Sequence, residues 1–467
     1  MLDNIILISD SYKASFHKMY PKGLTEAVAY LEARKPSDFA DYTVFFGLQY
    51  LINKLFITED NILEAKEFFK LHFGRDDVFN EDGWRYILET YNGELPIRID
   101  AVPEGTRVPT GNLLLRIENT DPKCAWLVSH VETLIVQLWY PCTVATLSHS
   151  VKRIIRDAWL TSSDSPESSI DFKLHDFGYR GVSSQESGAI GAAAHLINFK
   201  GTDTIAGCEF LNQYYGTSIA EGYSHNGMTG FSIPASEHSI AISYGPNRER
   251  DYIRGVLDAY PTGMVAMVID SYNDRNFLHI LGTDFQHEIM NRDGTVVVRT
   301  DSGEPEDAVL MALDILSHHF GYTVNSKGYK VLPPQVRVIH GDGINYESVP
   351  GIIEAILAAG YSIDNVAFGC GAGLLQKVNR DMFSFAYKFC NIVVDDVEME
   401  VCKRPAADSG KASKSGDLTL VTRDHRMLTI KAKEVLATDQ PMLQTVYFNQ
   451  PAMLAETTID EIRERAN

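Results

Sequence analysis

The second half of the chain repeats one pattern, in which a short apolar segment ends in Asp, Gly or Arg and gives way to a segment of helical character. Later copies lie on the order of 30 to 40 residues apart, close to the length of a strand, a crossover helix and the next parallel strand. In a parallel (β/α) barrel, catalytic residues gather on the face where the strands end. The segments that predict these strand ends are 174–176, 265–270, 296–301, 336–342 and 366–373.

The remainder of the chain predicts a second structural unit. The 467 residues exceed the length of about 250–300 at which a single core stops growing. The spacing of apolar residues predicts an amphipathic helix over 58–73, and alternation predicts an antiparallel strand pair over 97–102 and 113–117. We therefore expect an α/β protein with an irregular (β/α) barrel and a mixed α+β domain that is formed by the N- and C-terminal segments.

Local patterns predict further elements and the domain boundaries. The apolar run 5–8 indicates a buried first strand, 124–140 and 143–160 indicate helices, and the Ser-, Asp- and Pro-rich stretch 162–169 indicates a loop. Towards the end, 410–416 indicates a mobile loop, 418–421 a strand and 459–465 a helix. The expected domains are 1–165 (α+β), 166–385 (catalytic barrel) and 386–467, which packs back onto the first.

Charge and composition exclude several classes of function. A formal charge of -20 at pH 7 and a pI near 5.1 disfavour binding to nucleic acid and to anionic membranes. The chain contains no run of the ~20 apolar residues that a spanning helix needs. Six scattered cysteines have no zinc-type spacing and indicate reduced thiols in a cytoplasmic protein. A polyphosphate substrate would therefore need a local cluster of cations inside an acidic shell.

Two groups of residues at the predicted strand ends are candidates for phosphate and ribose binding. The glycine-rich segment 369–373 would let backbone N–H groups approach a phosphate, although a tight turn is the alternative. Asp270, Asp301 and Asp342 could accept ribose hydroxyls or bind Mg²⁺ through its waters. Helix capping explains one such Asp easily and three in register less well.

Other side chains could take part in binding or catalysis, and each also has an ordinary structural interpretation. Arg180 and Arg299 could hold a carboxamide or phosphate by fork geometry, or could form salt bridges to a neighbouring carboxylate. His238 follows Glu237 and suits nucleophilic work, but a structural histidine is the ordinary interpretation. Phe177 could stack on a flat heteroaromatic ring, as could Tyr12, although core packing is the commoner role of such aromatics.

Several longer motifs are more specific. They are DSYK at 10–13, KLHDFGYRG at 173–181, FKGTDT at 199–204, EH at 237–238, DSY at 270–272, DSG at 301–303, GDG at 341–343 and GLLQK at 373–377. In this order they closely resemble the nicotinamide phosphoribosyltransferase family, and the resemblance covers essentially the whole chain. It implies a type II phosphoribosyltransferase barrel that joins nicotinamide to phosphoribosyl pyrophosphate in NAD salvage. The sequence departs from the family pattern at Phe16, Ala266, Cys370 and Ala372.

The resemblance implies a role for each matching residue. The nicotinamide ring would stack between Phe177 and Tyr12 of the partner subunit, so the enzyme would be a homodimer. Arg299 and Asp203 would address the carboxamide, and Asp203 would disfavour nicotinate by repelling its carboxylate. Asp301 and Asp342 would hold the ribose hydroxyls, and Asp270 and Asp301 would help to hold the Mg²⁺–pyrophosphate. The 5′-phosphate would be held by Gly371, Ala372 and Arg380, and the polyphosphate by cations of the partner subunit, Arg34, Lys388, Lys403 and Lys411. Asp10, Arg180 and Gly341 complete the substrate-binding set.

The resemblance also implies a second substrate. His238 corresponds to a histidine that ATP phosphorylates, and Glu237 would help to orient it. The catalytic set is therefore His238, Asp301, Asp270 and Glu237, with Mg²⁺ as cofactor and ATP as co-substrate.

Three alternatives remain. A nicotinate phosphoribosyltransferase would share the barrel and the donor, but Asp203 argues against an acid substrate. A non-catalytic ligand or signalling protein on the same fold would lack site residues that this chain keeps. A barrel lyase would need a Schiff-base lysine inside an apolar strand, and the sequence shows none.

Overall fold

The computed structural model describes residues 3–216, 227–406, 412–449 and 456–467. The chain divides into two compact units. The sheet unit comprises Met1–Thr146, Tyr214–Gly216 and Asn379–Asn467, and the barrel unit comprises Leu147–Gln213 and Thr217–Val378. The first division falls within helix α6 (Trp139–Ser162), whereas the sequence pattern places a boundary at 165. The second falls at 378 rather than 385, and the C-terminal segment shares a unit with the N-terminal one.

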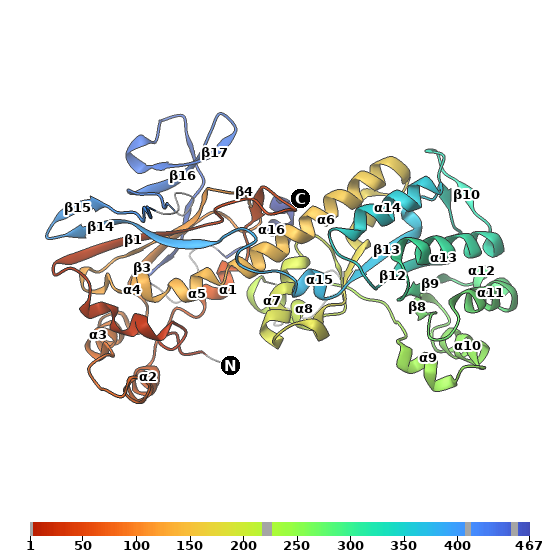
Figure 1. Ribbon diagram of the computed structural model, residues 1–467, viewed down its shortest axis with the longest axis horizontal. Coiled ribbons are helices and arrows are strands. Elements are labelled where there is room, and N and C mark those ends of the chain that lie inside the picture. The colour runs from red at the N-terminus through yellow and green to blue at the C-terminus, as the bar shows by residue number, and fades with distance from the viewer. Residues whose placement is uncertain (1–2, 217–226, 407–411, 450–455) are drawn as a thin grey trace. The chain divides into compact units, whose positions relative to one another are not determined.

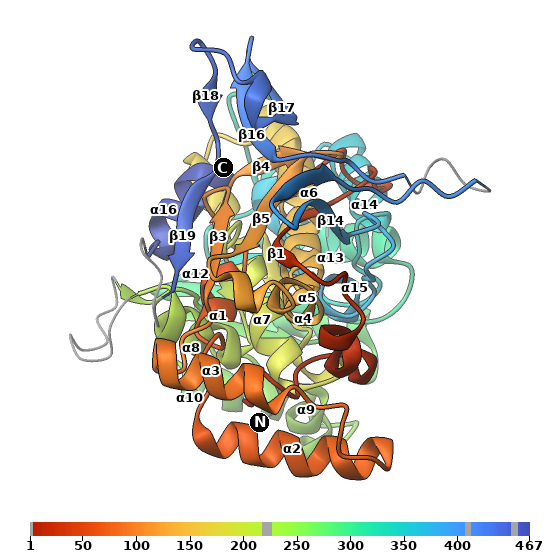
Figure 2. The same ribbon diagram turned by 90° about the vertical axis from the view of Figure 1, so that its left-hand side faces the viewer.

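The sheet unit is built around a six-stranded antiparallel sheet in the order β15-β14-β1-β5-β3-β19. Figure 2 shows β14, β1, β5 and β3 side by side. The predicted antiparallel pair is confirmed, since Ile99 lies opposite Ile117. The strands are β1 (Leu24–Glu32), β3 (Ile97–Ala101), β5 (Leu113–Asn119), β14 (Ala386–Val394), β15 (Val397–Glu400) and β19 (Gln444–Phe448).

The helices of this unit follow local signals in the sequence. The predicted helix α2 begins after Thr58, whose hydroxyl accepts a hydrogen bond from the Asn61 N–H, and ends at Gly74 in the left-handed region. The predicted helix over 124–140 is instead broken into short pieces. The helices are η1 (Ser11–Lys18), α1 (Leu48–Ile52), α2 (Glu59–Phe73), α3 (Glu81–Tyr91), η2 (Pro122–Cys124), α4 (Leu127–His130), α5 (Glu132–Val136), η9 (Ala432–Glu434) and α16 (Ile459–Ala466).

The expected first strand over 5–8 is wrong, because these residues form turns. The Asn4 carbonyl accepts hydrogen bonds from the N–H groups of Leu7 and Ile8, and its side chain accepts one from Ile6. An asparagine that bonds its own following backbone competes with strand pairing. Ile5 and Ile6 are still buried and Leu7 and Ile8 are half-buried, so the pattern predicted burial in part and conformation wrongly.

Two small sheets complete the sheet unit. They pair β2 (Tyr42–Val44) with β4 (Arg107–Pro109), and β16 (Leu418–Arg423) with β17 (Arg426–Lys431) and β18 (Gln440–Pro441). The strand predicted over 418–421 is therefore confirmed. The loop predicted over 410–416 lies partly outside the described residues.

The barrel unit confirms the predicted parallel barrel. Its strands run in the order β7-β6-β13-β12-β9-β8, and each neighbouring pair is parallel. Segment 231–235 forms single bridges to both edges, from Phe231 to Gly201 on β7 and from Ala235 to Ala266 on β8, so the sheet closes on itself. The strands are β6 (Leu174–Asp176), β7 (Gly201–Thr202), β8 (Gly263–Val268), β9 (Gly294–Thr300), β12 (Val336–His340) and β13 (Val366–Cys370).

Helices cover the outside of these strands, as Figure 1 shows for α11, α13 and α14 beside β8, β9 and β12. Inside the barrel, Ala266, Val297 and Ile339 form a buried apolar cluster. No helix in the described ranges is long and apolar enough to cross a membrane. The remaining elements are η3 (Glu167–Phe172), η4 (Tyr179–Gly181), α7 (Gln185–His195), α8 (Ile205–Tyr214), α9 (His238–Tyr244), α10 (Glu249–Ala259), α11 (Asp274–Asp284), α12 (Gln286–Met290), α13 (Pro305–Phe320), β10 (Thr323–Val324), β11 (Lys330–Val331), α14 (Ser348–Ala358), η7 (Ile363–Asn365) and α15 (Ala372–Leu375).

Candidate active site

Three aspartates follow neighbouring strands of the barrel unit, as predicted. Asp301 comes directly after β9, and Asp270 and Asp342 come two residues after the ends of β8 and β12. Capping does not explain them, because the N-cap residues of the helices that follow are Asn273, Glu304 and Glu347. Nothing in local structure therefore requires a carboxylate at these three positions.

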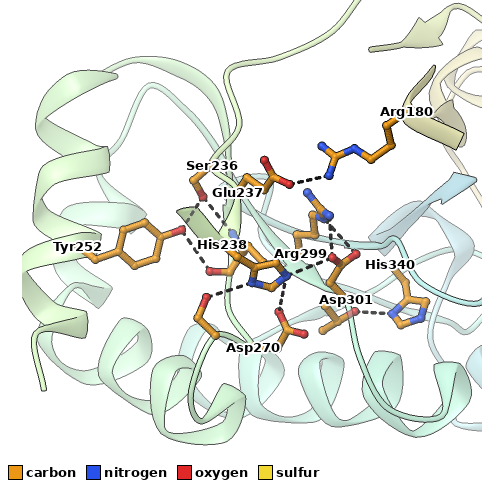
Figure 3. A network of polar contacts seen from close by, with 12 residues as sticks. Arg180, Ser236, Glu237, His238, Tyr252, Asp270, Arg299, Asp301 and His340 are labelled. Atoms are coloured by element: carbon orange, nitrogen blue, oxygen red, sulfur yellow. Dashed lines mark hydrogen bonds and ion pairs between the residues drawn. The ribbon is translucent and has the colours of Figure 1, made fainter. Parts of the chain in front are cut away.

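His238 faces two of these carboxylates at the start of α9 (Figure 3). Its Nε2 lies 3.3 Å from Asp301 Oδ2 and 4.0 Å from Asp270 Oδ1, and its Nδ1 lies 3.2 Å from Ser271 Oγ. A carboxylate only accepts, so Nε2 carries the proton, and in the neutral ring Nδ1 accepts from the serine hydroxyl. The imidazole is thus oriented on both sides, and 40% of its surface is exposed to a ligand.

Arg299 holds Asp301 with both ends of its guanidinium fork. Nη2 donates to Oδ2 at 2.7 Å and Nε to Oδ1 at 3.3 Å. The salt bridge expected for an ordinary arginine is therefore present, but the same guanidinium also lies 5.5 Å from the centre of the Phe177 ring. A Cβ on Gly341 would lie 2.6 Å from Asp301 Oδ1, so the glycine makes room for this carboxylate.

Phe177 and Asp203 follow the neighbouring strands β6 and β7. The Phe177 ring packs on the apolar cluster inside the barrel, and a Cβ on Gly369 would lie 2.0 Å from it. The Asp203 N–H donates to the Asp176 carbonyl at 2.9 Å, and the Asp203 carboxylate accepts from Ser232 Oγ. An aromatic face and a carboxylate are therefore fixed side by side at the carboxyl ends of the strands.

Two cavities meet at these residues. An open cleft of about 770 Å³ is lined by Arg180, Asp301, Asp342 and Gly371, among others. A second cavity of about 460 Å³ extends into the apolar interior of the barrel, towards Ala266 and Ile339. Phe177, Asp203 and Arg299 line both. A flat ring with a polar substituent suits this boundary, because its faces would meet Phe177 and its substituent would meet an acceptor and a donor.

Glu237 does not pair with His238. It is the N-cap residue of α9, and its carboxylate accepts from Arg180 Nη1 at 2.8 Å. This hydrogen bond is the first cause that lowers the pKa of Glu237, and the positive charge of Arg180 is the second. The Arg180 side chain is 80% exposed, so the guanidinium reaches the open cleft and an anion could compete for it.

The glycine-rich strand end has the geometry that phosphate binding requires. Gly371 is the N-cap residue of α15, and Ala372 is the first residue of that helix, so its φ is negative as an alanine requires. A Cβ on Gly178 would lie 2.9 Å from the Gly371 carbonyl oxygen, which shows how closely the two loops pack. Gly371 therefore borders the same cleft as Asp301 and Asp342, and Ala372 follows it in the chain.

The sheet unit gathers the predicted cations. Lys388 lies on β14 opposite Tyr30 of β1, and Arg34 follows β1 and donates from Nε to the Ser384 carbonyl at 3.0 Å. Burial lowers the pKa of Lys388, Glu132 opposes this, and the positive charges of Arg34, Lys403 and Arg380 lower the pKa further. These four residues define the basic cluster. Lys411, also predicted here, lies outside the described residues.

The predicted aromatic of the same unit is held outward. Lys13 is buried, and its ammonium donates to the Ser129 carbonyl at 3.0 Å and pairs with Glu132 at 2.7 Å. Asp10 accepts from Thr133 Oγ1 at 2.8 Å. Between these two anchors Tyr12 is 57% exposed, as a side chain that serves another molecule would be.

The carboxylates fit Mg²⁺ that arrives with a substrate. Asp270 Oδ1 is buried and has no hydrogen-bond partner, which indicates an oxygen reserved for a ligand. Within the part of the chain that the structure describes, no three His, Cys, Asp or Glu side chains form a complete metal site. Mg²⁺ commonly takes one or two carboxylates together with substrate phosphates, so the donor set is suitable.

Sequence reasoning missed several residues that support the site. Asp176 is fully buried, and its carboxylate accepts from the Gly178 N–H and the Thr202 hydroxyl, which ties the loops of Phe177 and Asp203 together. Ser232 holds Asp203, and Ser271 holds His238. Asp176 and Ser271 lie inside quoted motifs, which is the signal that could have found them; Ser232 carries no such signal.

Comparison with known proteins agrees with this geometry. Residues 172–444 match the nicotinate phosphoribosyltransferase (NAPRTase) family, and residues 4–99 match the N-terminal domain of nicotinamide phosphoribosyltransferase. Among solved structures, a nicotinate-nucleotide pyrophosphorylase from Pyrococcus furiosus is similar with a TM-score of 0.61 at 14% identity, covering 100% of this chain and 95% of that one. The human nicotinic acid phosphoribosyltransferase has a TM-score of 0.56 at 13% identity, covering 98% and 93%. These likenesses show the fold.

The chain therefore belongs to the nicotinate phosphoribosyltransferase (NAPRTase) family, a class of phosphoribosyl-transferring enzymes. The resemblance to nicotinamide phosphoribosyltransferases that the motifs carry is confirmed by the full-length relatives. Within it, the relatives of high coverage are nicotinamide phosphoribosyltransferases. That of Xanthomonas campestris pv. campestris is 45% identical over 476 residues, covering 100% of this chain and 98% of the relative. That of Acinetobacter baylyi is 30% identical over 492 residues, covering 98% and 95%.

Proposed function

We propose that this chain transfers the 5-phosphoribosyl group from phosphoribosyl pyrophosphate to the pyridine nitrogen of nicotinamide, giving nicotinamide mononucleotide and pyrophosphate in NAD salvage. The observation that carries this proposal is the grouping of Phe177, Asp203 and Arg299 at the boundary between the two cavities. The full-length relatives with this activity support it.

The amide is distinguished from the acid by Asp203. An amide offers NH₂ donors and a carbonyl acceptor, so Asp203 can accept and Arg299 can donate. Nicotinate would instead place a second carboxylate beside Asp203, which is unfavourable. Ser232 donates to one Asp203 oxygen and so fixes the orientation of the carboxylate.

Catalysis rests on positioning and charge, because the pyridine nitrogen needs no base to attack the ribosyl carbon. The reaction breaks the bond from C1 to pyrophosphate and forms the bond from C1 to nitrogen with inversion. Positive charge develops on the ribose in an oxocarbenium-like transition state, beside Asp301 and Asp342. These carboxylates would also accept the ribose hydroxyls, while Arg180, Gly371, Ala372 and Arg380 would bind phosphate.

Asp270 and Asp301 would hold Mg²⁺ together with the pyrophosphate. Bound there, Mg²⁺ would neutralise charge on the leaving group. The buried, unpartnered Asp270 Oδ1 supports this assignment.

ATP would phosphorylate His238 and so strengthen substrate binding and favour product. The fixed orientation of the ring, with Asp301 on Nε2 and Ser271 on Nδ1, supports this role. Glu237 would act through Arg180, with which it pairs, rather than by direct contact with the ring.

The enzyme would be a homodimer with two shared active sites. Tyr12 of the partner subunit would cover the second face of the nicotinamide ring. Four cations of the partner subunit would meet the polyphosphate, namely Arg34, Lys388, Lys403 and Lys411, and its Asp10 would lie beside them in the substrate-binding set. The outward Tyr12 and the concentration of positive charge around Lys388 in an acidic chain support this arrangement.

The decisive experiment supplies phosphoribosyl pyrophosphate and Mg²⁺ with either nicotinamide or nicotinate, with and without ATP, and measures each mononucleotide. Nicotinamide is expected to be preferred, and ATP is expected to raise the yield. A preference for nicotinate would instead favour the acid-specific enzyme of the same family.

A further inference from the structure

A closed ring of hydrogen bonds lies directly behind His238 (Figure 3). The Val268 N–H donates to Ser236 Oγ at 3.1 Å, and the Tyr252 hydroxyl donates to the Val268 carbonyl at 3.1 Å. Ser236 Oγ and Tyr252 OH lie 2.5 Å apart, and since the Tyr252 proton is used on Val268, Ser236 is the donor. The side chains of Ser236 and Tyr252 thus satisfy both backbone groups of Val268.

In this ring of hydrogen bonds, side chains continue the closure of the barrel that backbone pairing begins. The backbone ladder between segment 231–235 and β8 ends where the Ser236 N–H donates to the Ala266 carbonyl at 3.0 Å. Beyond this point Ser236 and Tyr252 replace strand pairing. Tyr252 reaches them from α10, where its ring packs 5.8 Å from the Phe277 ring of α11. Ser236 is 7% exposed and Tyr252 2% exposed, so water does not compete for these bonds.

The ring lies at the same short distance along the chain from two functional side chains. His238 follows Ser236 by two residues, and Asp270 follows Val268 by two residues. These two side chains face each other at 4.0 Å, and Ser271, next to Asp270, contacts the imidazole. A shift of segment 231–236 along β8 would therefore change the position of His238 relative to both.

We propose that Ser236 and Tyr252 are positioning residues that hold His238 in register with Asp270 and Ser271 for phosphorylation by ATP. This inference rests on the proposed function. It adds two residues that would act through His238 rather than by contact with a substrate. Each hydroxyl acts through the other, because the ring opens when either is removed.

The chain offers a matched control in the same unit. Tyr361 is 1% exposed, and its hydroxyl lies 2.8 Å from Ser317 Oγ and donates to Asp314 at 2.9 Å. Burial raises the pKa of both Tyr252 and Tyr361 to about 12. Ser317 and Asp314 lie on α13, away from the His238 contacts, so Tyr361→Phe removes a comparable buried hydroxyl without touching the register of His238.

The test measures phosphohistidine formed from γ-labelled ATP, ATP consumed per mononucleotide, and melting temperature. Tyr252→Phe and Ser236→Ala are each expected to slow phosphohistidine formation about fivefold, the effect of about one hydrogen bond. The double variant is expected to lose little more than either single one. Tyr361→Phe is expected to lower the melting temperature by a similar amount and to phosphorylate at the wild-type rate.

The wild-type protein and His238→Ala separate this inference from the function on which it rests. Label that is present in wild type and absent in His238→Ala establishes the phosphoacceptor. If Tyr252→Phe then phosphorylates as fast as Tyr361→Phe, the positioning role is overturned and the function stands. Additive losses in the double variant would also overturn it. If wild type takes up no label, the ATP step and the positioning role are both overturned.

Discussion

The barrel unit and the sheet unit differ in how their charged side chains are arranged. In the barrel unit several charged side chains of the site are paired within that unit: Arg299 holds Asp301, Asp301 faces His238, and Arg180 holds Glu237. In the sheet unit Arg34, Arg380, Lys388 and Lys403 gather so closely that three of them lower the pKa of the fourth. This contrast agrees with the proposal that the barrel unit stabilises a cationic transition state and the sheet unit binds a polyanion.

The largest effect is expected from the carboxylate that organises the barrel site. Asp301→Asn removes the charge that holds Arg299 by two bonds and faces the His238 ring. We expect kcat for nicotinamide to fall by about 100- to 1000-fold, as for loss of a preorganised charge at a reacting centre. Asp258→Asn is the control, because this side chain on α10 is 65% exposed. A loss of less than about threefold in Asp301→Asn would contradict a preorganised barrel site.

Removing a cation from the basic cluster is expected to act on binding rather than on chemistry. Lys388→Ala should raise KM for phosphoribosyl pyrophosphate by about one order of magnitude or more, because a charge-assisted bond contributes about 1.5–3 kcal/mol. Titration of initial rates with the donor measures this effect. Lys433→Ala, on a 71% exposed side chain of the same unit, should leave KM unchanged. An equal change in both variants would show that general charge, not the cluster, attracts the donor.

A smaller effect is expected on specificity. Asp203→Asn removes the charge that repels nicotinate and should narrow the ratio of kcat/KM for amide over acid by about tenfold. Ser232→Ala keeps the charge and removes only the hydrogen bond to it, so it should narrow the ratio less. Competition between the two vitamins measures both ratios. Unchanged selectivity in Asp203→Asn would remove this residue from the specificity site.

A last effect, on stability rather than on activity, is shared by the two units. Burial lowers the pKa of His130 in the sheet unit to about 4 and that of His195 in the barrel unit to about 3. Both rings are neutral when folded, so their stabilisation is complete above pH 6.5, the ordinary value, and declines as pH falls towards the folded pKa values. The unfolding free energy should therefore fall by up to about 1.4 kcal/mol per group for each pH unit below 6.5.

Chemical unfolding at pH 7.5 and pH 5 measures this decline. His195→Gln should make the dependence shallower at the cost of overall stability. An unfolding free energy that is the same at both pH values would show that the two rings are not held neutral.

Much of the barrel could be predicted because its signals are local. Each strand is a short apolar run, and Asp270, Asp301 and Asp342 lie one or two residues beyond the ends of such strands. The family motifs placed Phe177 and Asp203, and the structure brings both to one cavity wall. The location of each of these side chains depends on where a strand ends, and the sequence pattern indicates that point.

The supporting contacts could not be predicted, because their partners lie far apart in the chain. Asp176 meets Thr202 and Ser236 meets Tyr252 across 26 and 16 residues, and no sequence pattern indicates that the two members of either pair are in contact. The prediction of a strand over 5–8 was wrong because Asn4 accepts hydrogen bonds from the backbone N–H groups that follow it. These local bonds favour a turn, although the apolar pattern favours a strand. Tertiary contacts and local side-chain hydrogen bonds thus determine those parts of the structure that the apolar periodicity of the sequence does not predict.

The complementation of two inactive variants tests most directly whether one active site combines the barrel unit of one chain with the sheet unit of another. Asp301→Asn disables the barrel unit, and the pair Tyr12→Ala with Lys388→Ala disables the sheet unit. A mixed dimer, isolated by two different tags, would hold one intact site of two and should recover about half of the wild-type activity. Mixed dimers as inactive as their parents would show that each chain builds its site alone.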